Sequence, residues 1–206
     1  NGCMKITSNF TGHTATDGLN IESRSDNGDT TIVNYENTNM IFYTNAIERM
    51  RIDSVGRVTM PYQPAFYAIY ANSYSYTINS TNRTPIYGNA RINIGNYYNN
   101  TTGRFTAPKT GLYKIGVGIG GNSVSHSAGF LVIELTRNNT LDNSSYSMST
   151  SSNSGTEGGF NASFIISLNQ DDYINTNVYS NVDYPTGGTS NSWTQSRNYF
   201  YGYLIG

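Results

Sequence analysis

The chain has 206 residues and a formal net charge of -1 at pH 7, with 12% charged and 13% aromatic residues. This near-neutral charge gives no electrostatic basis for binding nucleic acid or anionic lipid, and no apolar run approaches the ~20 residues that a membrane-spanning helix needs. Asn, Ser and Thr number 28, 23 and 24, and these poor helix formers predict an all-β protein.

Residues 1–62 are sparse in apolar side chains and alternate short strands with polar turns. Asn27-Gly28 predicts one hairpin turn. The stretch 45–53 has helix-like spacing, but its alternation fits an irregular strand at least as well. So short a segment with so few large apolar groups would struggle to bury a core alone. We therefore expect several copies to share a core, as a β-rich, intertwined shaft segment over residues 1–62.

Pro61 and Pro64 interrupt this pattern, and residues 63–206 read as short strands between turn clusters. Ten strands without a helix predict a jelly-roll sandwich head. The predicted strands are 64–70, 84–87, 91–95, 103–108, 111–120, 129–137, 146–150, 159–168, 172–180 and 198–205.

Alternation in two of these strands bears on assembly. In 111–120, Gly116 and Gly118 lie on the face opposite Tyr113, and a glycine row in a strand indicates that something approaches it closely. The last strand carries apolar groups on both faces, which indicates burial on both. In a small jelly roll, another subunit covers the second face most simply. The residues expected at this interface are Tyr199, Tyr201, Tyr203, Tyr113, Gly116 and Gly118.

Two low-complexity segments, 138–159 and 183–197, are the candidate surface loops. The second contains Trp193, the only tryptophan. Aromatic side chains among amides suit sugar faces and sugar hydroxyls. A tryptophan folded back onto the head is the alternative and stays open. The candidate ligand-binding residues are Trp193, Tyr184, Asn191 and Tyr146.

Motifs in both parts of the chain resemble known families. The head motifs resemble the globular head of the complement C1q family, a tumour-necrosis-factor-like jelly roll. They are Asn96–Pro108 with Thr110–Tyr113, Val132–Asn138, Ser163–Tyr173 and Phe200–Ile205. Residues Glu48–Asp53 with Gly56-Arg-Val58 resemble units of bacteriophage tail-fibre shafts. Both families are trimeric, so the two resemblances imply a homotrimer.

Asp171-Asp172 is the most concentrated acidic pair. It is either a pair of calcium ligands, as in some heads of the resembled family, or a turn capped by aspartate. Calcium, at this pair, is the only cofactor that the sequence suggests. No catalytic residue is expected, because His13 and His126 suggest no triad and no two carboxylates are placed at glycosidase spacing.

These features predict a non-enzymatic phage fibre tip on the virion surface, a tail-fibre or receptor-binding protein. Its partners are its own copies and a host cell-surface glycan or protein, bound by the head loops. Neither nucleic acid nor insertion into a membrane is expected. One alternative is a structural capsid or collar fibre, with the head as a trimerisation module. A polysaccharide depolymerase is the third possibility.

Overall fold

The computed structural model describes residues 3–24, 26–70, 76–81, 84–121, 129–151, 158–182, 184–186 and 197–206. Every element bounded within these ranges is a β-strand, as the all-β prediction requires. No helix among these residues is long and apolar enough to span a bilayer. Contacts between Cα atoms divide the chain into two compact units, Asn1–Tyr62 and Gln63–Gly206.

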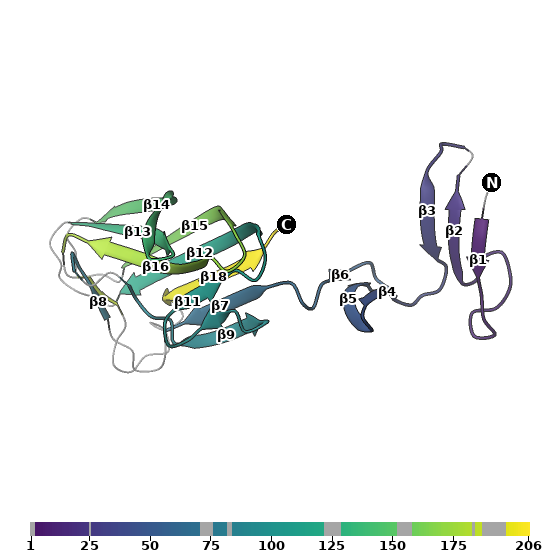
Figure 1. Ribbon diagram of the computed structural model, residues 1–206, viewed down its shortest axis with the longest axis horizontal. Coiled ribbons are helices and arrows are strands. Elements are labelled where there is room, and N and C mark those ends of the chain that lie inside the picture. The colour runs from purple at the N-terminus through teal and green to yellow at the C-terminus, as the bar shows by residue number, and fades with distance from the viewer. Residues whose placement is uncertain are drawn as a thin grey trace. The chain divides into compact units, whose positions relative to one another are not determined.

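The first unit consists of two small antiparallel sheets (Figure 1). One contains β1 (Cys3–Ile6), β2 (Leu19–Ser23) and β3 (Thr30–Asn34), and the other contains β4 (Met40–Thr44), β5 (Ile47–Ile52) and β6 (Val58–Thr59). Gly28, with φ 81°, lies in the predicted turn between β2 and β3. Asn45 and Ala46, with φ 52° and 57°, close the β4–β5 hairpin. The stretch 45–53 is therefore a turn and a strand rather than a helix.

The first unit has no apolar core of its own. Among its described residues only Gly18 and Asn20 are buried. Large apolar side chains project into solvent instead, including Phe10, which is 90% exposed, and Ile32, which is 54% exposed. The ion pair between Glu48 and Arg51, at 2.6 Å, lies near the surface. Such pairs contribute only ~0–1 kcal/mol, so they do not replace a core.

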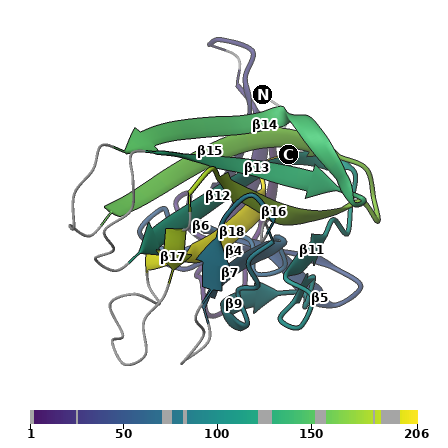
Figure 2. The ribbon, with the colours of Figure 1, turned by 90° about the vertical axis from the view of Figure 1, so that its left-hand side faces the viewer.

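The second unit, the head, stacks two antiparallel sheets (Figures 1 and 2). The seven-stranded sheet has the order β8-β17-β12-β18-β7-β9, with β15 also paired to β12, and the five-stranded sheet has the order β10-β11-β16-β13-β14. The strands are β7 (Ala65–Ile69), β8 (Tyr76–Ile78), β9 (Asn89–Ile94), β10 (Tyr98–Asn99), β11 (Arg104–Thr106), β12 (Gly111–Gly121), β13 (Gly129–Arg137), β14 (Thr140–Ser151), β15 (Gly158–Leu168), β16 (Tyr173–Ser180), β17 (Tyr184–Thr186) and β18 (Tyr199–Leu204).

The strand count corrects the prediction of ten. The structure has β8, β10 and β17 in addition, and the predicted strand 84–87 is not one. The segment 138–159 is not a single loop either, because the predicted strand 146–150 is part of a longer strand, β14, which occupies residues 140–151. β14 pairs with β13 from Gly129↔Ser151 to Arg137↔Thr140. Ladder pairing with a long neighbour therefore outweighs the weak strand preference of a Ser- and Asn-rich sequence.

The core of the head lies between the two sheets. Tyr113, Ile115, Val117 and Ile119 of β12 are at most 1% exposed, so these alternate residues form the core face of the strand, opposite the glycine row. The Phe66 ring stacks on Tyr98 and Phe105 at centroid distances of 4.9 and 4.6 Å. Phe200 of β18 meets Phe66 edge-on at 4.8 Å. These contacts join both sheets and leave the opposite face of each one turned outward.

Candidate functional site

The outward face of the seven-stranded sheet places tyrosine rings over a row of glycines. β12 and β18 pair so that Gly116 lies opposite Tyr201 and Gly118 opposite Tyr199. A Cβ atom built on Gly116 would lie 2.2 Å from Tyr201 Cε1, and one on Gly118 would lie 2.3 Å from Tyr199 Cε1. The close approach that the glycine row predicts is therefore made by rings of the same chain.

These rings form a continuous surface with their neighbours. Tyr199 and Tyr201 stack at a centroid distance of 6.0 Å, and Tyr67 of β7 lies 6.2 Å from Tyr199. The Tyr199 hydroxyl donates to Asn161 Oδ1 at 3.0 Å. Partial burial raises the pKa of Tyr199. We call the set Tyr67, Tyr199, Tyr201 and Tyr203 the tyrosine face.

Exposed aliphatic side chains extend the tyrosine face. Strand pairing sets Lys114 of β12 between Tyr203 on one side and Ile165 on the other. Tyr203 is 45% exposed, Ile165 60% and Leu112 47%. A large apolar patch on a soluble domain marks a surface for association. The sequence reasoning missed Ile165, although strict alternation along 163–167 would have placed it outward.

Tyr113 does not belong to this surface. It is fully buried on the core face of β12, and its hydroxyl donates to the Lys109 carbonyl at 2.7 Å. Successive residues of a strand point to opposite faces, so Tyr113 cannot share the outward face of Gly116 and Gly118. We therefore remove Tyr113 from the predicted interface set.

Several strand ends meet at one end of the head (Figure 1). Gly121 pairs with both Gly158 and Thr186. In the other sheet, Gly129 pairs with Ser151. We call this the distal end. Gln63, where the chain enters the head, lies at the other end, because its side-chain amide donates to the Leu204 carbonyl at 3.0 Å.

The structure does not bring the predicted ligand-binding residues into one described site. Tyr146 lies in β14 opposite Glu134 and is 59% exposed. Tyr184 lies in β17 of the other sheet, opposite Ile78. Trp193 and Asn191 lie outside the described residues. A shared role for these four side chains stays a prediction.

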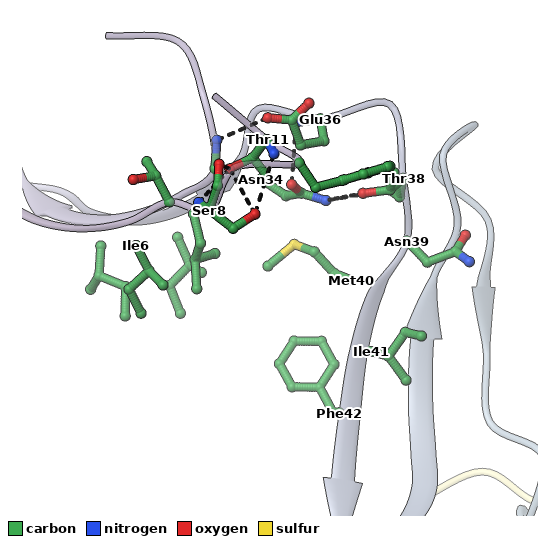
Figure 3. Close-up of a pocket in the computed structure, with 16 residues that line it drawn as sticks. Ile6, Ser8, Thr11, Asn34, Glu36, Thr38, Asn39, Met40, Ile41 and Phe42 are labelled. Atoms are coloured by element: carbon green, nitrogen blue, oxygen red, sulfur yellow. Dashed lines mark hydrogen bonds between the residues drawn. The ribbon is translucent and has the colours of Figure 1, made fainter. Parts of the chain in front are cut away.

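A groove of about 560 Å³ runs across the first unit. Figure 3 shows Ile6, Met40 and Phe42 beside it, with hydrogen-bonded polar side chains at one edge. Among these, Asn34 Nδ2 donates to Thr38 Oγ1 at 3.2 Å. The groove is therefore an apolar concavity that opens to solvent in a unit without a core.

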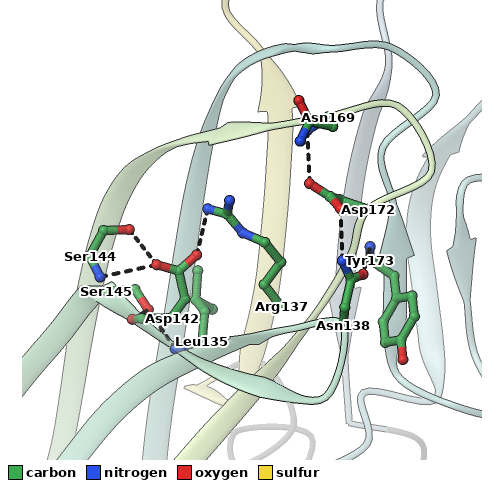
Figure 4. A network of polar contacts seen from close by, with 9 residues as sticks. All are labelled: Leu135, Arg137, Asn138, Asp142, Ser144, Ser145, Asn169, Asp172 and Tyr173. Atoms are coloured by element: carbon green, nitrogen blue, oxygen red, sulfur yellow. Dashed lines mark hydrogen bonds and ion pairs between the residues drawn. The ribbon is translucent and has the colours of Figure 1, made fainter.

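The Asp171-Asp172 pair lies in the turn before β16 (Figure 4). Asp172 Oδ1 accepts from Asn138 Nδ2 at 2.7 Å, and Oδ2 accepts from the Asn169 backbone N–H at 2.8 Å. These donors lower the pKa of Asp172, with the Asn138 amide contributing most. Asp171 adopts φ 69°. The described residues hold no group of three His, Cys, Asp or Glu able to bind a metal ion, so calcium at this pair stays a prediction.

Comparison with known proteins bears on the head. The family model of the C1q domain matches residues 65–205. No curated protein sequence matches the chain. The globular domain of zebrafish complement 1qA protein is similar at 13% identity, with 70% of this chain and 98% of that chain covered and a TM-score of 0.46. Murine APRIL at pH 5.0 is similar at 10% identity, with 69% and 99% covered and a TM-score of 0.48. Eiger TNF from S. frugiperda is similar at 10% identity, with 70% and 93% covered and a TM-score of 0.49.

Proposed function

The chain belongs to the C1q domain family, and from this premise we propose that it is a homotrimeric fibre tip. Residues 1–62 form a shaft segment shared by three copies, and the head presents its distal end to a host cell surface. The C1q domain is a common trimerising module, which supports the assembly. The phage origin rests on the tail-fibre resemblance of Glu48–Val58.

The missing core of the first unit carries this proposal. A unit with only Gly18 and Asn20 buried among its described residues does not gain enough from burial to offset the conformational entropy lost on folding. Neighbouring copies supply the missing burial if they cover the groove beside Ile6, Met40 and Phe42. Asn20 Oδ1 is buried without a hydrogen-bond partner among the residues that the structure describes, and a neighbouring copy would also supply its donor.

The tyrosine face supports association of the heads. Burying it would remove exposed apolar surface of Tyr203, Ile165 and Leu112 from water, at about 25 cal/mol for each Å² covered. A closed ring of three copies would cover this face on every subunit without leaving an open end. The head then contributes its own interface, independent of the first unit.

The distal end suits binding. The segments 122–128, 152–157 and 187–196 each join strands that end there, and the chain enters the head at the opposite end. Three copies of such an end on one axis would turn weak contacts with a repeated surface component into strong adhesion. The described residues suggest no catalytic group, so we propose binding without chemistry.

Light scattering on the whole chain tests the assembly. We expect three times the chain mass of 22.7 kDa, unchanged by dilution into the micromolar range. A stable monomer would overturn the proposed fibre. Repeating the measurement with a chelator tests Asp171 and Asp172: a loss of mass that added Ca²⁺ restores would support a calcium role.

Adsorption to cells tests the binding end. Replacing residues 187–196 by a short Gly-Ser linker should abolish adsorption while the trimer mass is kept. Gln170→Ala is the matched control, because this exposed residue lies in the turn at the opposite end of the head. If the linker variant adsorbs as well as the parent, the structural-fibre alternative replaces receptor binding.

A further inference from the structure

A row of polar side chains crosses three strands on the outward face of the five-stranded sheet. Arg104 of β11 pairs with Asn175 of β16, given the neighbouring register Phe105↔Ile174, and Asn175 pairs with Thr136 of β13. Phe105 and Ile174 are fully buried in the core, so the alternate residues point outward. This row borders a pocket of about 310 Å³. Its lining residues are Thr84, Thr102, Arg104, Thr136, Asn139 and Asn175.

The Arg104 guanidinium is held in place but not neutralised. Its Cζ lies 4.3 Å from the centroid of the Tyr173 ring, and its Nη2 donates to Asn139 Oδ1 at 2.9 Å. The ion pairs within the described residues involve other arginines. The Glu134 carboxylate accepts from Asn177 Nδ2 at 2.9 Å. The pocket therefore carries a fixed positive charge.

Asn175 adds a buried acceptor at the pocket. The residue is 6% exposed, and its Nδ2 donates to the Thr102 carbonyl at 3.2 Å. This bond fixes the amide, because the flipped orientation would set two carbonyl oxygens against each other. Asn175 Oδ1 has no hydrogen-bond partner within the described part of the chain. Buried polar atoms in native proteins are nearly always paired, so an unpaired one beside a pocket indicates a missing donor.

We infer that this pocket binds a carboxylate-bearing sugar unit, such as a hexuronate of a surface polysaccharide. A guanidinium with free N–H groups suits a carboxylate. Threonine hydroxyls and amides suit sugar hydroxyls, which can both donate and accept. The volume lies at the lower end of the ~300–1,000 Å³ range of ligand pockets, which fits one sugar ring. The assignment of a polysaccharide rests on the proposed function.

Titration of the intact protein with a galacturonate trimer tests this inference, with a neutral hexose trimer and sodium acetate as comparison ligands. We expect saturable binding of the galacturonate trimer only, weakened at 0.5 M salt. Arg104→Gln should weaken it at least about tenfold, since a charge-assisted hydrogen bond is lost. Arg104→Lys should retain only part of the parent's affinity, because lysine keeps the positive charge but lacks the paired N–H donors of a guanidinium. Thr136→Val should cause a smaller loss.

Arg91→Gln is the matched control, because Arg91 is an exposed arginine on β9 that does not line the pocket. Light scattering confirms that each variant keeps its assembly. Equal binding of the neutral trimer, no binding of any trimer, or equal losses in Arg91→Gln and Arg104→Gln would each overturn the inference. Adsorption that depends on residues 187–196 would leave the proposed function intact in any of these cases.

Discussion

Gly116→Ala isolates the packing of the tyrosine face from its role in association. Gly116 adopts ordinary extended backbone, so a methyl group introduces no backbone strain. It would, however, lie 2.2 and 2.3 Å from Tyr201 Cε1 and Cζ, whereas carbon atoms pack at about 3.5–4.0 Å. The Tyr201 ring must therefore move away from the strand by more than an ångström.

The ring cannot move freely, because it stacks on Tyr199 at 6.0 Å. Overpacking of this kind costs about 1–3 kcal/mol. In a Tyr201→Ala background the ring is absent. Gly116→Ala should then raise the free energy of unfolding by about 0.4–1 kcal/mol, because alanine lowers the conformational entropy of the unfolded chain. The two changes should therefore show a coupling energy of about 1.5–4 kcal/mol.

Equilibrium unfolding in urea measures the four members of this cycle. All are compared at one protein concentration, because association contributes to the apparent free energy of unfolding. Gly206→Ala serves as the control, since nothing lies within 4 Å of its Cβ position. If Gly116→Ala costs the same free energy with and without the Tyr201 ring, the ring does not pack on this glycine and the reasoning fails.

Three further predictions concern pH and assembly. Burial raises the pKa of Tyr98. The neutral Tyr98 side chain therefore makes its full contribution to the free energy of unfolding below about pH 10, and this contribution declines as the pH rises further. Tyr98→Phe should lower the free energy of unfolding by about 1 kcal/mol at pH 7. It should also make this free energy fall less steeply at alkaline pH, as measured by urea unfolding at a series of pH values. Asp172→Asn should lower the free energy of unfolding by about 1 kcal/mol at pH 7. That cost should vanish well below pH 3.9, because the Asp172 pKa is lowered mainly by Asn138. Ile32→Asp should lower the mass of the assembly measured by sedimentation at low protein concentration. An unchanged mass would contradict a core shared between copies of the first unit.

Strands with strict alternation could be predicted from the sequence. β12 is the clearest case, because its large side chains fill the core and its glycines face the tyrosines. Its buried face and its glycine row follow from a period of two residues, whereas the tyrosines that cover the glycines are set by the register with β18. The C1q resemblance read from the head motifs is likewise confirmed by the family match over residues 65–205.

Strands that depend on a partner could be predicted only in part. The predicted strand 146–150 covers part of β14, but the first residues of β14 are rich in Ser and Asn, which favour turns. Their pairing with β13 begins at Arg137↔Thr140. The short strands β10 and β17 contain two and three residues. Segments this short carry too few side chains for a periodic pattern.

The sugar pocket lay beyond sequence reasoning for a similar reason. Arg104, Thr136 and Asn175 come from three strands, and only the register of β11, β16 and β13 brings them into one row. From the sequence alone, Arg137, Arg91 and Arg104 are all candidate partners of Glu134. In the structure, Glu134 accepts a hydrogen bond from Asn177, and Arg104 stacks on the Tyr173 ring. Register across a sheet is fixed by the whole fold, so local patterns do not reveal it.

The proposed trimer would stabilise the two units for different physical reasons. The head buries a continuous core, from Phe66 to Phe200, within a single chain, and only its tyrosine face gains from a neighbour. The first unit buries no apolar side chain among its described residues, so in the proposed trimer its folding would be coupled to its association. Trimerisation of the head would hold three first units at high local concentration, which lowers the entropic cost of assembling them. In the proposed fibre, the head would therefore nucleate assembly, and the proposed shaft segment would depend on it.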